Sequence, residues 1–139
     1  RVVYWVVWAR EEFWLSVFNL LSSLPRTVDE EFIEELIVGR GIRIERIVSF
    51  GQASPDGYWY DQEEAELVVV LSGNARLTIE GENEDRVLGP GDATYLPAHC
   101  RHRVTSTDAG SPTVWLAIFL DSNLDPVPTE HLSVEASRR

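Results

Sequence analysis

Short segments typical of β-strands, separated by glycine- and proline-containing turns, constrain the fold of this chain more than any other feature. Residues 74–80 alternate apolar and polar side chains, a period typical of a half-buried strand. Residues 113–120 are nearly all apolar, as in a strand that is buried on both faces. Turn-forming stretches such as residues 51–57 and 89–92 lie between segments of this kind. The pattern predicts an all-β sandwich or barrel, and within that class a jelly roll encloses a lumen suited to one small ligand.

One segment near the N-terminus departs from this pattern. Residues 27–30, Thr-Val-Asp-Glu, match the capping box with which many helices begin. The apolar residues that follow at helical spacing are Phe32, Ile33, Leu36 and Ile37. Glycines at positions 39 and 41 then supply a typical helix end. We therefore expect a short N-terminal helix over residues 28–38 that packs against the sheet, followed by the barrel over residues 42–120.

The size and charge of the chain narrow the classes of protein to which it can belong. Its 139 residues suit a single domain, which can bury a core without a disulfide or a structural metal. The 23 acidic and 12 basic residues give a net charge of -11, which would repel a phosphate backbone, so we expect no nucleic-acid partner. The single cysteine, Cys100, cannot form an internal disulfide, which makes the cytoplasm the expected compartment.

Residues 1–18 form an apolar N-terminal extension ahead of the expected domain over residues 19–120. The apolar run within the extension, residues 2–9, is far shorter than the ~20 residues of a membrane-spanning helix, so we expect no membrane association. Three explanations of the extension stay open: a secretion signal, a strand or hydrophobic contact exchanged in a dimer, and upstream sequence translated ahead of a start codon at Val17. Residues 121–139 are expected to form a polar C-terminal tail.

Two stretches carry the residues suited to chemistry. The first, residues 54–73, opens with turn formers, passes through an aromatic and acidic corner, and ends as an apolar strand. The second, residues 88–104, places His99 and His102 after a Pro-Gly turn. A polar corner that leads into a buried strand is a place where a barrel can hold a ligand or an ion. His102 is the better ligand candidate, because strand parity places His99 on the opposite face.

Together the two stretches resemble the two signature motifs of the cupin superfamily, over residues 42–120. Glu66 and Gly73 have the spacing of the glutamate and the glycine in the first motif. The histidine positions of that motif hold Tyr60 and Gln62 or, at the longer spacing, Trp59 and Asp61.

In the second motif, Pro97, His102 and Ser106 occupy the proline, histidine and asparagine positions, and His99 replaces the glycine. The resemblance covers most of the chain. It implies a small single-domain cupin, whose fold is a double-stranded β-helix or jelly-roll barrel, and it implies a homodimer.

The usual metal centre of the family has three histidines and one glutamate inside the barrel. The resemblance assigns Glu66 and His102 as ligands here, assisted by Gln62 or Asp61 from the corner. One imidazole with oxygen ligands is a weaker site for zinc, copper or nickel than three histidines, so we expect zinc, iron or manganese with water completing the shell. A site without metal, in which His102 is hydrogen-bonded to Glu66 in the core, stays open as the alternative.

Tyr58, Trp59 and Tyr60 are the expected ligand-binding residues, because aromatic rings line concave sites and stack on apolar or sugar-like ligands. Packing at the barrel mouth is the alternative for the same three residues. The sequence thus predicts a cupin that binds a divalent metal, and a metal-dependent oxygenase or isomerase acting on a small organic acid or carbohydrate is one form of it. The competing prediction is a non-catalytic ligand-binding or sensing cupin with a degenerate metal site.

Overall fold

The computed structural model describes residues 3–4, 17–25 and 29–130, which form β-strands and one short 3-10 helix. The strands are β1 (Val3–Tyr4), β2 (Phe32–Gly39), β3 (Ile42–Ser49), β4 (Ala65–Ser72), β5 (Ala75–Ile79), β6 (Arg86–Leu88), β7 (Ala93–Leu96), β8 (His102–Thr107) and β9 (Thr113–Leu120). The 3-10 helix η2 (Ser122–Leu124) follows the last strand. The expected all-β class is therefore confirmed.

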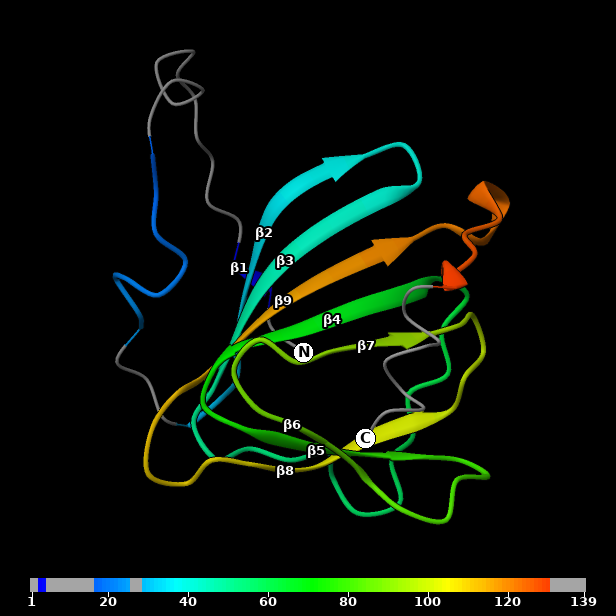
Figure 1. Ribbon diagram of the computed structural model, residues 1–139. Helices are drawn as coiled ribbons and strands as arrows, with labels where there is room; N and C mark the ends of the chain where they lie inside the picture. Colours follow the sequence, from blue (N-terminus) through cyan, green and yellow to red (C-terminus); the bar gives the residue numbers. More distant parts are fainter. Residues whose placement is uncertain (1–2, 5–16, 26–28, 131–139) are drawn as a thin grey trace.

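The strands form two sheets that face each other (Figure 1). The larger sheet has the order β1-β2-β3-β9-β4-β7 and the smaller one has the order β6-β5-β8. Neighbouring strands run antiparallel, except that β1 is parallel to β2. The core lies between the sheets, where Val68 and Trp115 of the larger sheet meet Leu77 and Leu88 of the smaller one. This arrangement is consistent with a double-stranded β-helix, and it leaves an interior that both sheets line.

The helix expected over residues 28–38 is wrong, because residues 32–39 form the strand β2. Ile33 of β2 pairs with Ile47 of β3, and the register shifts between Glu35 and Ile37, which leaves Leu36 as the extra residue of a bulge. The bulge moves the later apolar residues by one position, so the segment has a helix-like spacing although its conformation is extended. Pairing with β3 satisfies the backbone of β2, and this long-range interaction outweighs the local helix signal.

A tight approach between two chain segments fixes the turn after β4. Gly73 has a φ of +80°, and a Cβ atom placed on it would lie 2.7 Å from the Cα of Thr113. The hydroxyl of Thr113 in turn donates to the carbonyl oxygen of Asn74 at 3.0 Å. Only glycine fits this turn without displacing the first residue of β9, which explains the glycine at the end of the first motif.

The N-terminal extension lies mostly outside the described residues. Of the extension over residues 1–18, the structure describes Val3 and Tyr4, which form β1, and residues 17 and 18. Residues 20–22 are held against the larger sheet by the buried Arg46, whose guanidinium donates to the carbonyl oxygens of Leu20 and Ser22. Of the expected tail, residues 131–139 lie outside the described part of the chain. No helix within the described residues has the length and apolar character needed to cross a membrane.

Candidate functional site

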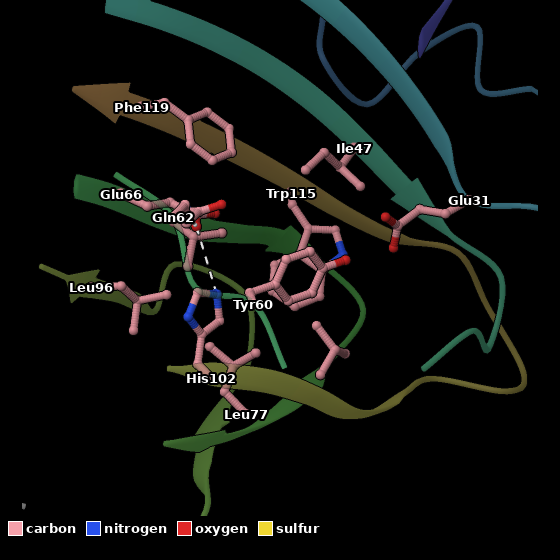
Figure 2. A pocket seen from close by; sticks show the side chains of 12 residues that line it. Glu31, Ile47, Tyr60, Gln62, Glu66, Leu77, Leu96, His102, Trp115 and Phe119 are labelled. Carbon is pink, nitrogen blue, oxygen red and sulfur yellow. Dashed lines mark hydrogen bonds and ion pairs between the residues drawn. The ribbon is translucent and has the colours of Figure 1, made fainter. Parts of the chain in front are cut away.

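A small polar chamber lies between the two sheets, and we call it the inner chamber (Figure 2). Its volume is about 40 Å³. The polar residues that line it are Glu31, Tyr60, Gln62, Glu66 and His102, and the apolar ones include Leu77, Leu96, Trp115 and Phe119. Figure 2 shows Glu66, Gln62 and His102 together at one end and Glu31 at the other, beyond Trp115. A water molecule needs roughly 10–15 Å³ of such cavity volume. The chamber therefore has room for an ion with a few waters or for one end of a ligand.

Glu66 and His102 meet in this chamber, although 36 residues separate them in the chain. Glu66 is the second residue of β4 and His102 the first residue of β8, so the pair joins the two sheets. Both side chains are buried, and Nε2 of His102 lies 3.8 Å from Oε2 of Glu66. The backbone of Tyr60 anchors the corner beside them, because its N–H donates to the carbonyl oxygen of His102 at 2.7 Å. The structure thus brings these two motif residues together inside the barrel.

A hydrogen bond at Nδ1 sets the tautomer of the His102 ring. Nδ1 lies 2.7 Å from the carbonyl oxygen of Cys100. A carbonyl oxygen can only accept, so Nδ1 carries the hydrogen and Nε2 presents a lone pair to Glu66 when the ring is neutral. Histidine ligands in metal sites are typically oriented in this way, by donation from the other ring nitrogen to a carbonyl or carboxylate.

Burial favours the neutral form of this ring. Loss of solvent lowers the pKa of His102 below its usual 6.5, and the positive charge of Arg86 lowers it further, while the hydrogen bond to the Cys100 carbonyl acts in the opposite direction. The lone pair of Nε2 is therefore available at neutral pH. Two hydrogen-bond acceptors, an imidazole nitrogen and a carboxylate oxygen, then face one another across 3.8 Å.

The two corner residues considered as further ligands lie in different surroundings. The amide nitrogen of Gln62 donates to Oε2 of Glu66 at 2.9 Å, so Gln62 belongs to the inner chamber. Asp61 does not line it: its carboxylate is half exposed and lies 2.8 Å from Nδ1 of His99, which is also exposed. Of the two alternatives, the structure brings Gln62 and not Asp61 to the pair. His99 lies on the surface, in the turn between β7 and β8.

A second and larger cavity, which we call the outer chamber, adjoins the inner one. Its volume is about 440 Å³, and it shares Glu31, Tyr60 and Val104 with the inner chamber. Tyr58 and Tyr60 both line it, with their rings in edge-to-face contact at 5.0 Å. Tyr60 also stacks on His102, with ring centroids 5.3 Å apart. Trp59 lines neither chamber and lies beside the guanidinium of Arg101.

Sequence reasoning missed Glu31, which lines both chambers. The indole N–H of Trp115 donates to the hydroxyl of Ser49 at 3.0 Å, and that hydroxyl donates to the carboxylate of Glu31 at 2.8 Å. This chain of hydrogen bonds fixes one carboxylate oxygen at the junction of the chambers. Because residues 28–38 were expected to form a helix that packs against the sheet through other side chains, no direct signal pointed to Glu31.

Comparison with known proteins supports the family suggested by the motifs. A family model described as a cupin domain matches residues 49–119, which is half of the chain. This chain is a cupin. No curated protein matches it.

Solved structures agree with this assignment. The cupin is similar to a Ralstonia eutropha JMP134 protein provisionally named mannose-6-phosphate isomerase, with 48% identity and a TM-score of 0.74 over 76% of this chain and 98% of that one. A cupin superfamily protein from Desulfitobacterium hafniense DCB-2 matches with 19% identity and a TM-score of 0.59, over 70% of this chain and 84% of that one. An RmlC-like cupin with a double-stranded β-helix fold, from Methanocaldococcus jannaschii, matches with 17% identity and a TM-score of 0.56, over 74% of this chain and 93% of that one. The two distant matches show the fold.

The donor set of this cupin fits a metal ion held by few protein ligands, and it does not fit a three-histidine centre. Among the described residues, no three His, Cys, Asp or Glu side chains are grouped so that they could hold an ion. Two donors on a tetrahedral ion, each about 2.1 Å from it, lie about 3.4 Å apart. The 3.8 Å between Glu66 and His102 is close to this separation, and the carbonyl-bound Nδ1 leaves Nε2 ready to ligate.

Proposed function

We propose that this cupin binds one divalent metal ion, zinc, iron or manganese, in the inner chamber, together with a small organic ligand that extends into the outer chamber. Glu66 and His102 supply the protein ligands, and the side-chain oxygen of Gln62 supplies a third after rotation of the amide. Waters or the ligand complete the shell. The observation that carries the proposal is the buried, face-to-face position of the Glu66 carboxylate and the Nε2 lone pair of His102.

Two buried acceptors facing one another are unfavourable unless a cation or a group that donates hydrogens lies between them. A neutral imidazole cannot donate from Nε2 while Nδ1 holds its hydrogen, so the pair does not form a direct hydrogen bond. A cation placed between the two atoms satisfies both lone pairs, and both residue types are common ligands of the ions named above. The pair therefore has the chemistry of an open metal site.

The reaction type that these residues support best is isomerisation of a carbohydrate. The name of the Ralstonia relative, at 48% identity, supports an isomerase. A bound ion would polarise a carbonyl or hydroxyl oxygen of the ligand. Glu66 is placed to accept a proton within the chamber, and Tyr60, stacked on His102, positions the ligand between the chambers.

A second candidate function is non-catalytic ligand binding without a metal. The observation that favours it is the hydrogen bond from Gln62 to Oε2 of Glu66, the same oxygen that faces His102. In this form a water or a ligand group with two hydrogens bridges Glu66 and His102, and Gln62 keeps its present orientation. The metal content of the purified protein distinguishes the metal-dependent function from metal-free ligand binding.

The test is elemental analysis of protein purified without chelator, followed by calorimetric titration of the metal-depleted protein with Zn²⁺ and Mn²⁺. We expect close to one ion per chain, and a loss of at least about tenfold in affinity in Glu66→Gln and in His102→Gln. Asp61→Asn is the matched control, because it removes a carboxylate of the same corner outside the chamber and should leave binding unchanged. Less than about a tenth of an equivalent, even after supplementation, would refute the metal proposal, since intact protein sites bind tightly.

Homodimerisation is a separate proposal that rests on the family resemblance. Two observations are compatible with it: β2 lies near the edge of the larger sheet, and Ile37 and Val38 near its end are 56% and 59% exposed. Multi-angle light scattering over a range of concentrations tests it. A monomer mass at the highest concentration reached would remove the proposal.

A further inference from the structure

The two chambers adjoin one another, and the charged groups that line them are of one sign. They share Glu31, Tyr60 and Val104, so a ligand that occupies both would pass these three residues. The inner chamber, at about 40 Å³, takes only one end of a ligand, and the outer one, at about 440 Å³, is large enough for the body of a monosaccharide. The far end of a ligand anchored at Glu66 and His102 therefore lies in the outer chamber.

The charged groups that line the outer chamber are carboxylates. They belong to Glu30 and Glu31, and the described residues that line either chamber include no arginine or lysine. A phosphate or carboxylate group of a ligand would thus meet like charge, and the repulsion is screened less at the half-buried Glu31 than at the exposed Glu30.

Two arginines near the chambers interact with other groups. Arg103 donates to the carbonyl oxygens of Ser54 and Pro55 in the chamber wall. Arg86 pairs with Glu82. A bidentate arginine clamp, the usual means of binding phosphate, is therefore absent among the described lining residues.

The guanidinium of Arg43 lies over the ring of Phe119, at 4.1 Å from its centroid, and Arg43 does not line the inner chamber. It bridges Glu45 at 2.6 Å and Glu64 at 2.7 Å. This arginine is consequently compensated by two acids and is not available to a ligand.

The same lining suits hydroxyl groups. A carboxylate only accepts, so Glu31 is a partner for ligand hydroxyls, and its orientation is fixed in advance by Ser49. The rings of Tyr58 and Tyr60 offer the apolar surface on which the C–H face of a sugar ring stacks. Fixed acceptors beside aromatic rings match a polyhydroxylated ring without an acidic substituent.

We propose that the ligand of this site is an uncharged monosaccharide-sized polyol or sugar, and that the pair Glu30 and Glu31 excludes the corresponding phosphate ester. This inference rests on the proposed function for the position of the ligand, and it differs from the sugar phosphate in the name of the Ralstonia relative. The specificity is thus assigned to two acidic residues just ahead of β2, at the opposite end of the site from Glu66 and His102.

The test is calorimetric titration with matched probes: D-mannose, D-glucose and D-fructose, the 6-phosphate of each, and D-mannosamine as a cationic counterpart. We expect at least one uncharged sugar to bind at millimolar concentration or below, and its 6-phosphate to bind at least about tenfold more weakly. Tighter binding of a 6-phosphate than of its parent sugar would overturn the proposal. So would binding of mannosamine without any neutral sugar, or no binding of any neutral sugar.

Glu31→Gln provides the second measurement, because it removes the charge and keeps an oxygen that can accept from Ser49. The ratio of neutral-sugar to sugar-phosphate affinity should fall several-fold in this variant. Glu84→Gln is the matched control, since it makes the same change in net charge on an exposed turn between β5 and β6 and should leave the ratio unchanged. Thermal unfolding verifies that both variants fold. An unchanged ratio in a folded Glu31→Gln protein would overturn the assignment to Glu31.

Failure of the sugar-specificity proposal can be distinguished from failure of the metal proposal. Preference for a neutral sugar by a protein that holds no metal would refute the metal proposal and keep this one. A metal-loaded protein that prefers the phosphate ester would keep the metal proposal and refute the preference for an uncharged sugar.

Discussion

Nε2 of His102 and Oε2 of Glu66 face each other at 3.8 Å inside the barrel, and with His102 neutral its Nε2 carries no hydrogen for the carboxyl group. The relationship follows from three features of the chain. The first motif places Glu66 at the start of β4, the second places His102 at the start of β8, and the carbonyl of Cys100 fixes the hydrogen on Nδ1. Such a pair is suited to holding a cation, and it lowers the stability of the metal-free protein.

Glu66→Gln should therefore stabilise the metal-free protein while it weakens metal binding. With its amide nitrogen in the place of Oε2, the new side chain can donate to Nε2 of His102 and, once Gln62 turns its amide oxygen inward, to Gln62, so an unfavourable contact becomes a hydrogen bond worth about 1 kcal/mol. Urea unfolding in the presence of chelator measures the change in the free energy of unfolding. A variant less stable than the parent protein under these conditions would show that Glu66 serves the fold and not a ligand.

The stability of the metal-free protein should fall as the pH falls below about 6.5. Because burial lowers the pKa of His102 in the folded state, the unfolded chain takes up the proton first, and this contribution to stability is complete above the unfolded pKa and lost as the pH falls toward the folded one. His102→Gln lacks this contribution. Urea unfolding at pH 8, 6.5 and 5 should thus show a shallower acid loss in the variant. Parallel profiles of the two proteins would contradict the lowered pKa.

Gly73→Ala should destabilise the protein more than Gly81→Ala does. Both glycines have positive φ values, +80° and +88°, so each substitution carries a backbone cost of about 1 kcal/mol. Only Gly73 also lacks space, since a Cβ atom there lies 2.7 Å from the Cα of Thr113, whereas nothing lies within 4 Å at Gly81. We expect a further loss of about 2 kcal/mol at Gly73, measured by chemical unfolding. Equal losses would show that the turn accommodates the side chain.

Ser49→Ala should destabilise the fold and weaken sugar binding together. Ser49 is fully buried and joins the indole N–H of Trp115 to the carboxylate of Glu31. Its removal leaves a buried N–H unsatisfied, at a cost of about 1–3 kcal/mol, and it releases the carboxylate at the junction of the chambers. Chemical unfolding and calorimetric titration with the neutral sugar measure the two effects. Unchanged sugar affinity in the folded variant would show that the orientation of Glu31 does not depend on Ser49.

Much of the fold followed from local patterns, because a strand period of two is visible in the sequence without knowledge of its partner. The meeting of Glu66 and His102 was predictable for a different reason, since motif spacing carries long-range information that periodicity lacks. The strand β2 was not predictable in this way. Its bulge at Leu36 imitates helical spacing over a segment of only eight residues, and only pairing with β3 decides between the two structures.

The limits of sequence reasoning at the site have the same origin. Gln62 and Asp61 are adjacent in the chain, and only the three-dimensional structure shows that the first faces Glu66 and the second pairs with His99 on the surface. Glu31 reaches the site through contacts with Ser49 on a neighbouring strand. Such positions depend on register between distant segments, which a single sequence does not specify.

The most direct test of the central claim is a crystal structure of protein purified without chelator, with anomalous diffraction recorded on both sides of the absorption edges of zinc, iron and manganese. The account predicts one anomalous peak in the inner chamber, about 2.0–2.3 Å from Oε2 of Glu66 and from Nε2 of His102. A chamber that shows only water between these two atoms, in crystals grown with added metal, would contradict it.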